Sequence, residues 1–278
     1  MTESWGFSVV ILTLNEERNL PGCLAALRGC DDIVVLDSGS TDRTVELART
    51  AGARVITHPF RDFASQRNHA HAAAAFRHDW VFHLDADEVL TPELIAQCRA
   101  RAAQSDPAID GYYAAPRMMF AGRWLRHCTD YPAWQARFVH WRRFHFIEVG
   151  HGQREAPGMR MGHLTGDYLH DITVTDLAEW ERKHRRYARA EAQAYLAQSR
   201  AAGSALAALL RGPALARRRA VKRLSHRLPL RPLLRFLYQY GLRRGFLDGP
   251  AAYQYCRLLA RYEGFVDEAI RAARTATP

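Results

Sequence analysis

Four strand-like runs alternate with helical stretches over the first 105 residues. The runs cover residues 7–14, 33–36, 54–57 and 80–84 and are dominated by apolar and β-branched side chains. Runs of this kind are typical of strands in a sheet covered on both faces. Helical stretches are expected at 20–27, 44–51, 64–76 and 92–102, the last opening with a Thr91 cap and Pro92. The alternation predicts a doubly wound α/β fold with a mostly parallel sheet.

Three of these runs end in acidic or polar side chains. Asn15-Glu16 follows the first run, Asp37-Ser-Gly-Ser-Thr-Asp42 the second, and Asp85-Ala-Asp87 the fourth. Ligands of open α/β sheets bind beyond the carboxyl ends of the strands. We therefore expect the three clusters to line one crevice. Their separation to opposite sides of the molecule would overturn this interpretation.

The Asp85-Ala-Asp87 motif indicates a metal site. Two carboxylates that flank one small residue can hold Mg²⁺ or Mn²⁺ through oxygen ligands. The cation would neutralise charge on a leaving nucleoside diphosphate. The motif also fits a solvated turn, but its place after an apolar strand and before a capped helix favours metal binding. In the turn at residues 37–42, Ser40, Thr41 and Asp42 can cap the following helix and Asp37 can bind a base or ribose, and both can be true. No G-x-G-x-x-G motif is present, so a dinucleotide-binding fold is not supported.

Four motifs in order resemble those of the family 2 glycosyltransferases with the GT-A fold. They are Thr13-Leu-Asn-Glu-Glu17, residues 37–42, Gln66-Arg-Asn68 and the segment Trp80 to Glu88. The nearest resemblance is to the branch of lipopolysaccharide-core and exopolysaccharide glucosyltransferases. It implies a Rossmann-like, mostly parallel sheet and a nucleotide-diphospho-sugar donor, commonly a UDP-sugar.

The same resemblance implies roles for individual residues. The nucleoside would be contacted by Thr13, Asn15, Glu16 and Asp37. The diphosphate or donor sugar would lie near Arg67 and Asn68, and arginine matches phosphate oxygens well. Asp85 and Asp87 would place the metal against the diphosphate. His170, in Tyr168-Leu-His170, resembles a third metal ligand, and its alternative role is that of a packing histidine.

The catalytic base is open. An inverting transfer needs a carboxylate that takes the proton of the acceptor hydroxyl. The lipopolysaccharide-core branch usually shows a His-Glu pair, but here Gly152 follows His151. The candidates are, in order, Asp130, Glu155 and Glu148, and each of them also fits a surface ion pair.

The carboxyl-terminal third is basic and helical in pattern. No acidic residue lies between Glu191 and Asp248, while arginines, leucines and aromatic residues interleave. Basic amphipathic helices of this kind lie on anionic membranes. The alternatives are plain packing on the catalytic domain and nucleic-acid binding, but no recognised nucleic-acid module is visible.

Bulk properties restrict the cellular setting. The formal net charge is +10, and the five cysteines are scattered without a C-x-x-C pair, which argues against a disulfide framework and fits a reducing compartment. Neither a signal peptide nor a run of about 18 apolar residues is apparent. We expect a cytoplasmic protein that is peripheral on the inner face of the cytoplasmic membrane.

These observations predict a GT-A catalytic domain at residues 1–172 and a basic, membrane-apposed helical extension at 173–278. Residues 1–105 would form the nucleotide-sugar half and 106–172 the acceptor half. The predicted reaction is the metal-dependent, inverting transfer of a hexose, with glucose from a UDP-sugar first, to a hydroxyl of a lipid-linked, lipopolysaccharide or exopolysaccharide acceptor. A polyprenyl-phosphate acceptor and a degenerate sugar-nucleotide binding protein are the alternatives. Donor sugar, acceptor, linkage and oligomeric state are left open.

Overall fold

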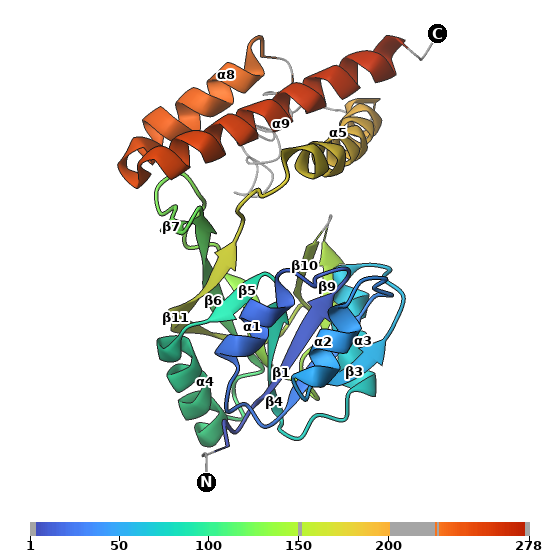
Figure 1. Cartoon of the computed structure of the whole chain (residues 1–278), viewed down its shortest axis with the longest axis vertical. Helices are drawn as coiled ribbons and strands as arrows, with labels where there is room; N and C mark the ends of the chain where they lie inside the picture. The colour runs from blue at the N-terminus through green and yellow to red at the C-terminus, as the bar shows by residue number, and fades with distance from the viewer. Residues whose placement is uncertain (1–3, 150–151, 201–225, 227, 276–278) are drawn as a thin grey trace. The chain divides into compact units, whose positions relative to one another are not determined.

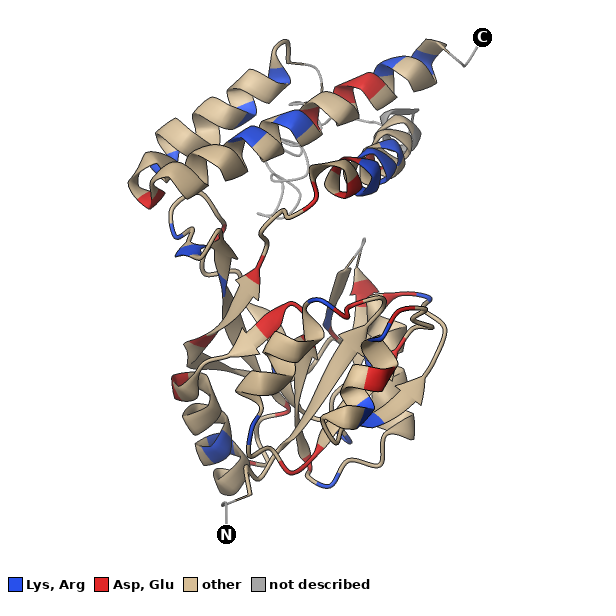
Figure 2. Cartoon of the chain, viewed as in Figure 1, with Lys and Arg blue, Asp and Glu red and all other residues tan. Residues whose placement is uncertain are grey.

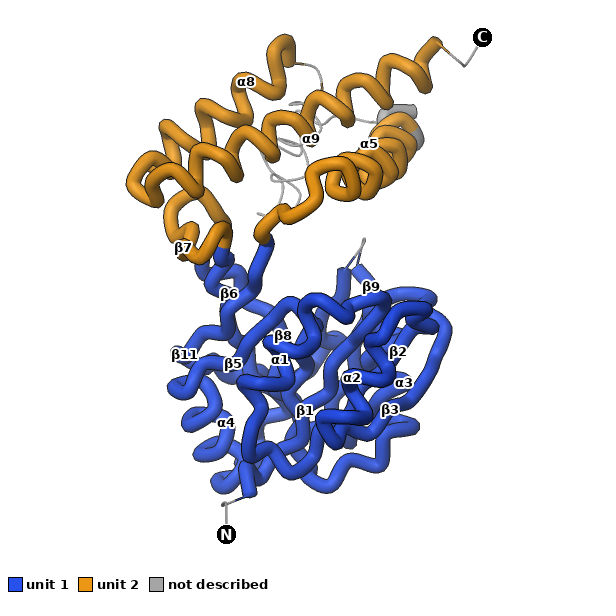
Figure 3. The backbone as a smooth tube through the Cα atoms, in the orientation of Figure 1, with its two compact units in different colours: residues 1–119, 131–172 blue, residues 120–130, 173–278 orange. Residues whose placement is uncertain are grey.

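The chain forms two compact units (Figure 1). The computed structural model describes residues 4–149, 152–200, 226 and 228–275. The first unit comprises the chain up to Met119 together with Tyr131–Ile172, and the second comprises Phe120–Asp130 and the chain from Thr173 onward. Figure 3 distinguishes the two units by colour.

One mixed sheet organises the first unit. Its strand order is β3-β2-β1-β4-β8-β6-β11-β5. The strands are β1 (Ser8–Thr13), β2 (Ile33–Asp37), β3 (Arg54–Thr57), β4 (Trp80–Asp85), β5 (Glu88–Leu90), β6 (Gly111–Phe120), β8 (Gln135–His140) and β11 (Met161–Asp171). Strands β3, β2, β1 and β4 run parallel, and β8 is antiparallel to β4 and β6. The predicted α/β class is confirmed, and strands from both halves of residues 1–172 join one sheet.

Helices cover both faces of this sheet. On one face, α1 (Leu20–Ala26), α2 (Thr44–Thr50) and α4 (Pro92–Gln104) pack over a core that includes Val9 and Ile11. On the other face, α3 (Phe63–Ala73) packs over Val10. Successive strand residues point to opposite faces, so an unbroken apolar strand is what such a three-layer arrangement requires. The predicted Thr91 cap is present, since its hydroxyl accepts the Leu94 N–H at 3.3 Å.

Three short strands, β5, β9 (Phe146–Val149) and β10 (Gly152–Glu155), were not predicted as individual elements. Strand β5 has three residues and pairs antiparallel with β11, with His170 opposite Glu88. Strands β9 and β10 form a separate two-stranded sheet. Such short segments have too little pattern of their own, and their partners far along the chain define them.

The second unit contains helices and one short strand, β7 (Arg123–Trp124). The helices are α5 (Leu177–Arg200), α8 (Arg231–Phe236), the π-helix η1 (Leu237–Leu242), the 3₁₀-helix η2 (Gly245–Asp248) and α9 (Pro250–Thr275). Helices α5 and α9 share an apolar core that includes Tyr195 and Phe265. Among the described helices none is both long and apolar enough to cross a membrane. The most basic part of the predicted extension, residues 201–225 and 227, lies outside the described residues.

Residues 120–130 belong to the second unit, whereas the sequence predicts them within a catalytic domain at residues 1–172. The buried Asp248 carboxylate accepts the backbone N–H groups of His127 and Cys128 at 2.8 and 3.1 Å and the His127 Nδ1–H at 2.6 Å. Gln239 donates to the Cys128 carbonyl at 2.8 Å. A Cβ on Gly245 would lie 2.7 Å from the Gln239 carbonyl oxygen, so only glycine fits this close approach. These bonds attach the 120–130 segment to η1 and η2.

Replacing Asp248 should therefore weaken the second unit. Asp248→Ala leaves two buried N–H donors without an acceptor, and we expect the free energy of unfolding to fall by roughly 2–4 kcal/mol. Urea titration followed by circular dichroism measures this loss. Glu268→Gln on α9 is the matched control, because its ion pair with Arg185 is solvent-exposed and should contribute about 0–1 kcal/mol. Equal effects of the two substitutions would contradict the assignment.

Candidate active site

The three predicted clusters meet at one edge of the sheet. Strand β1 lies between β2 and β4, with Thr13 opposite Asp37 and Leu12 opposite Asp85 in parallel register. The loops that follow these strands therefore leave the same edge. The expectation of a shared edge is confirmed, and the outcome that would have overturned it does not occur.

The loops after β1 and β2 are joined by reciprocal hydrogen bonds. The Asn15 N–H donates to Ser40 Oγ at 2.9 Å, and the Asn15 side-chain oxygen accepts the Thr41 N–H at 2.8 Å. The Glu16 N–H donates to Thr44 Oγ1 at 2.8 Å. Asn15 has a φ of 57°, a left-handed conformation that asparagine tolerates better than most residues. The two loops thus form one fixed wall.

The Asp37 side chain holds these two loops in place. Its side chain is buried and accepts hydrogen bonds from Thr13 Oγ1 at 2.9 Å, the Gly39 N–H at 2.9 Å and the Ser40 N–H at 2.8 Å. Thr13 is buried as well. Both residues fix the loop. Of the predicted caps, Asp42 accepts the Thr44 N–H at 3.0 Å at the start of α2, although the N-cap residue itself is Arg43. Direct contact of Thr13, Asn15, Glu16 or Asp37 with a nucleoside stays a prediction.

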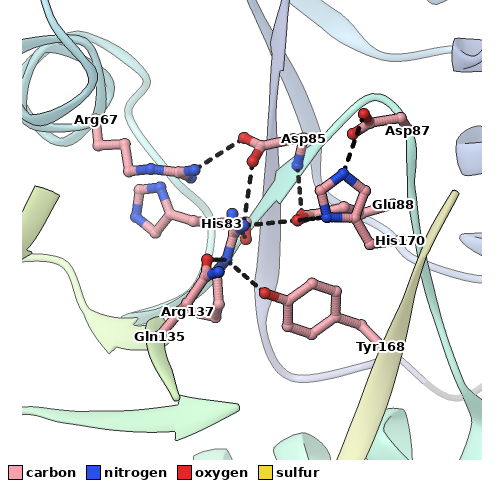
Figure 4. A network of polar contacts seen from close by, with 9 residues as sticks. All are labelled: Arg67, His83, Asp85, Asp87, Glu88, Gln135, Arg137, Tyr168 and His170. Atoms are coloured by element: carbon pink, nitrogen blue, oxygen red, sulfur yellow. Dashed lines mark hydrogen bonds and ion pairs between the residues drawn. The ribbon is translucent and has the colours of Figure 1, made fainter. Parts of the chain in front are cut away.

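A buried ion-pair network holds Asp85 at the end of β4 (Figure 4). Asp85 Oδ1 lies 2.8 Å from Arg67 Nη2 on α3, and Oδ2 lies 3.1 Å from Arg137 Nη2 on β8. The Asp85 N–H donates to Glu88 Oε2 at 2.9 Å. Burial disfavours the ionised carboxylate, but the two guanidinium groups prevail and hold the pKa of Asp85 well below its usual range.

Arg137 makes the largest number of contacts in this network, and it is not among the site residues predicted from the sequence. Its side chain is 3% exposed, and Nη2 lies 2.6 Å from Glu88 Oε1. Nη1 donates to the His83 carbonyl at 3.3 Å, and Nε donates to the Tyr168 hydroxyl at 3.2 Å. Burial raises the pKa of Glu88 to about 7, and the Arg137 guanidinium opposes that rise. An arginine within the apolar strand Gln135–His140 was the available signal, because buried charges require partners.

Asp87 and His170 form the second part of the site. Asp87 Oδ2 lies 3.3 Å from His170 Nε2, and their side chains are 36% and 23% exposed. The β5–β11 pairing brings them together, and the Asp171 N–H donates to the Asp87 carbonyl at 3.1 Å. Burial lowers the pKa of His170, but Asp87 and Glu88 outweigh it and raise the pKa above its ordinary value.

These two side chains fit a divalent cation. Adjacent ligands on one such ion lie about 3 Å apart, since metal–ligand distances are about 2.0–2.2 Å, and the 3.3 Å separation of Oδ2 and Nε2 is close to this. The predicted three-residue set is not assembled, because Asp85 faces Arg67 and Arg137 instead. Within the described part of the chain, no group of three or more His, Cys, Asp or Glu side chains is arranged to hold a metal. Diphosphate or water oxygens would have to supply the remaining ligands.

Arg67 and Asn68 have structural partners. Arg67 is 1% exposed and acts on the site through its ion pair with Asp85. The Asn68 side chain donates to the Phe146 carbonyl at 2.8 Å and accepts the Phe146 N–H at 3.0 Å, which joins α3 to β9. Their predicted nearness to the diphosphate or donor sugar is untested.

The base candidates belong to other elements of the chain. Asp130 belongs to the second unit, where its 82% exposed side chain lies 2.7 Å from Arg243 Nη1. Glu148 is on β9 and Glu155 on β10. No hydrogen bond or ion pair among residues 4–149 and 152–200 links either glutamate to Asp85, Asp87 or His170. His151, where the sequence departs from the His-Glu pair, lies outside the described residues.

Comparison with known proteins identifies the family. A family model described as "Glycosyl transferase family 2" matches residues 8–163, more than half of the chain. The chain belongs to glycosyl transferase family 2. The match begins at β1 and covers Asp37, Asp85, Asp87 and Arg137, but it ends before His170.

Similar proteins are found among both sequences and structures. This family 2 glycosyltransferase is 36% identical over 120 residues to the lipopolysaccharide core biosynthesis glycosyltransferase LpsC of Rhizobium meliloti, covering 41% of this chain and 43% of LpsC. It is 38% identical over 88 residues to an uncharacterized glycosyltransferase of Rickettsia typhi, covering 31% of this chain and 30% of that protein. The chain thus spans less than half the length of these relatives.

Two solved structures share lower similarity. Glucosyl-3-phosphoglycerate synthase from Mycobacterium tuberculosis, in complex with Mn²⁺, UDP and phosphoglyceric acid, is 26% identical over 42% of this chain and 43% of that chain, with a TM-score of 0.33. TarS residues 1–349 from S. aureus, in complex with UDP-GlcNAc, is 15% identical over 92% of both chains, with a TM-score of 0.43.

The ion pairs of Arg137 should contribute a large part of the free energy of unfolding of this family 2 domain. Arg137→Met leaves Glu88 buried without its cation, and we expect a loss of about 3–5 kcal/mol in the free energy of unfolding. Adding Glu88→Gln removes the unpaired charge and should restore part of that loss. Urea unfolding of both variants tests this coupling. Purely additive losses would contradict it.

Proposed function

We propose that this family 2 glycosyltransferase transfers a hexose, with inversion, from a nucleoside-diphosphate sugar to an acceptor hydroxyl. UDP-glucose is the first donor to test. The supporting observation is the convergence of Asp85, Asp87 and His170 beside the Asp37 loop at one sheet edge. Inside a family 2 domain, this edge would bind the nucleoside at the loops after β1 and β2 and a cation at Asp87 and His170.

The residues at this edge would have two different roles, metal binding and the positioning of Asp85. Asp87 and His170 would hold Mg²⁺ or Mn²⁺, which when bound neutralises charge on the leaving diphosphate. Arg67 and Arg137 keep Asp85 ionised and fixed. Asp85 is thereby a rigid acceptor for a donor hydroxyl and a support for the turn that carries Asp87. Such pre-organisation avoids reorganisation of the site during transfer.

The acceptor is the less constrained partner. The name of LpsC supports a saccharide of the lipopolysaccharide core, and a lipid-linked or exopolysaccharide acceptor belongs to the same proposal, as does a peripheral position at the inner face of the cytoplasmic membrane. A neutral hydroxyl needs a base, and Asp130, Glu155 and Glu148 stay the candidates. A polyprenyl phosphate would need no strong base. Product analysis with defined acceptors separates these acceptors, and donor binding without transfer would favour a degenerate binding protein.

Asp87→Asn tests the metal site directly. The substitution keeps the shape and removes the charge, so UDP with Mn²⁺ should no longer stabilise the protein. Wild type should gain about 2.7 kcal/mol at a hundredfold excess of ligand over its dissociation constant. Transferase activity should fall at least about a hundredfold. Thermal shift and product formation are the measurements. Asp79→Asn is the matched control, because Asp79 lies just before β4 at its opposite end. Full activity of Asp87→Asn would overturn the mechanism.

Metal binding should also depend on pH through His170. Only the neutral imidazole binds a metal, and Asp87 and Glu88 raise the pKa of His170 above 6.5 despite its burial. The affinity for Mn²⁺ in the presence of UDP should therefore fall as the pH drops through that raised pKa, by at most about tenfold per pH unit. Titrations between pH 8.5 and 6 measure the slope. His170→Asn should flatten it, and His163→Gln on the same strand should not. A wild-type affinity independent of pH would remove His170 from the site.

A further inference from the structure

An apolar stripe in the second unit faces outward. Leu230, Leu233, Leu234, Leu237 and Tyr238 recur at the spacing of one helix face along α8 and η1. Their exposed fractions are 70%, 50%, 42%, 54% and 44%. A helix in water normally turns such a stripe toward the protein core. We call these five residues the α8 stripe.

Two polar side chains of the same segment, Arg231 and Gln239, face inward. Arg231 is 5% exposed, and its guanidinium lies 2.5 Å from Glu263 and 3.4 Å from Asp267, both on α9. Gln239 is also 5% exposed and donates to the Cys128 carbonyl. Phe236 and Tyr240 pack on Tyr253 of α9, with ring centroids 5.7 Å apart in each pair. The leucines of the segment nevertheless remain outside.

The next turns extend the apolar character. Leu242 is 77% exposed, and Phe246 and Leu247 are each 51% exposed. Eight large apolar side chains are thus exposed within residues 230–247. Large exposed apolar patches are uncommon on soluble monomers and mark places where another surface docks.

The charge of this surface indicates which partner fits. Residues 228–247 contain no Asp or Glu, and Figure 2 shows basic but no acidic residues along α8. Arg244 is exposed, and no carboxylate of the described residues forms an ion pair with it. Arg235 and Arg243 are half-buried and paired with Glu263 and Asp130. An apolar face with a basic edge matches the boundary between headgroups and acyl chains of an anionic bilayer.

We propose that the α8 stripe docks onto the surface of an anionic lipid bilayer. Its leucines enter the headgroup region, Tyr238 lies at the interface, and Arg244 meets lipid phosphate. A second copy of the chain fits less well, because a symmetric contact through this face would bring its arginines together. The inference deepens the proposed function, since docking would hold the enzyme beside a lipid-linked acceptor, but the docking itself requires no donor.

Co-sedimentation of the full 278-residue chain with vesicles tests the proposal. The probes are phosphatidylethanolamine vesicles with about 30% phosphatidylglycerol and vesicles of phosphatidylcholine alone. Wild type should bind the anionic vesicles more strongly. Leu233→Gln with Leu237→Gln preserves helix propensity and should lower the partition coefficient at least about tenfold. Arg244→Gln should lower it about fivefold, on anionic vesicles only.

Leu177→Gln is the matched control. Leu177 is 45% exposed on α5 in the same unit, and its replacement should leave vesicle binding unchanged. Unchanged circular dichroism and an unchanged thermal shift with UDP and Mn²⁺ show that the double variant is folded and binds donor. Docking can thus fail while the proposed function stands, and the reverse holds too.

Three results would overturn the docking proposal. The first is that wild type binds neither kind of vesicle. The second is equal vesicle binding by wild type and the double variant. The third is a change from dimer to monomer in the double variant with vesicle binding unaltered, which would make the α8 stripe an interface between copies.

Discussion

The buried contact of Arg137 with Asp85 and Glu88 is the constraint around which the first unit is built. A guanidinium that is 3% exposed is stable only if carboxylates and carbonyls surround it. Meeting that need ties β8 to the ends of β4 and β5, and to β11 through Tyr168. The same contacts hold Asp85 ionised and fix the turn that presents Asp87. Stability and site geometry therefore depend on one set of ion pairs.

The polar side chains of the site form a buried group and a partly exposed group. Asp37 and Glu88 are buried and use their oxygens within the protein, whereas the Asp85, Asp87 and His170 side chains remain partly exposed. A cation added at Asp87 and His170 would thus meet a pair whose surroundings are already ordered. In the second unit, the arginine is buried and the apolar side chains are exposed. Arg231 lies among acidic residues, and the leucines beside it face outward. In each unit, buried arginine–carboxylate contacts fix the segment whose other side chains are exposed.

Local pattern was sufficient for the amino-terminal half of the fold. The runs of β-branched residues, the Thr91 cap and the polar ends of the first, second and fourth strands each depend on residues within one short segment. The parallel order of β1, β2 and β4 then follows from general rules of α/β connection, so Asp37 and Asp85 could be expected at one edge.

What only the tertiary structure decided involves partners distant in the chain. Glu88 and His170 become neighbours through the pairing of three-residue β5 with β11, and Arg137 gains its role because its partners come from β4, β5 and β11. Residues 120–130 join the second unit because Asp248 binds their backbone. The sequence also did not indicate that the α8 stripe is exposed, because helical spacing defines a face of a helix but not whether that face is buried. By itself the sequence determined the strands, the α/β class and the acidic edge, because those features are local. Pairing and burial determined which charges meet, because they depend on contacts that no single segment encodes.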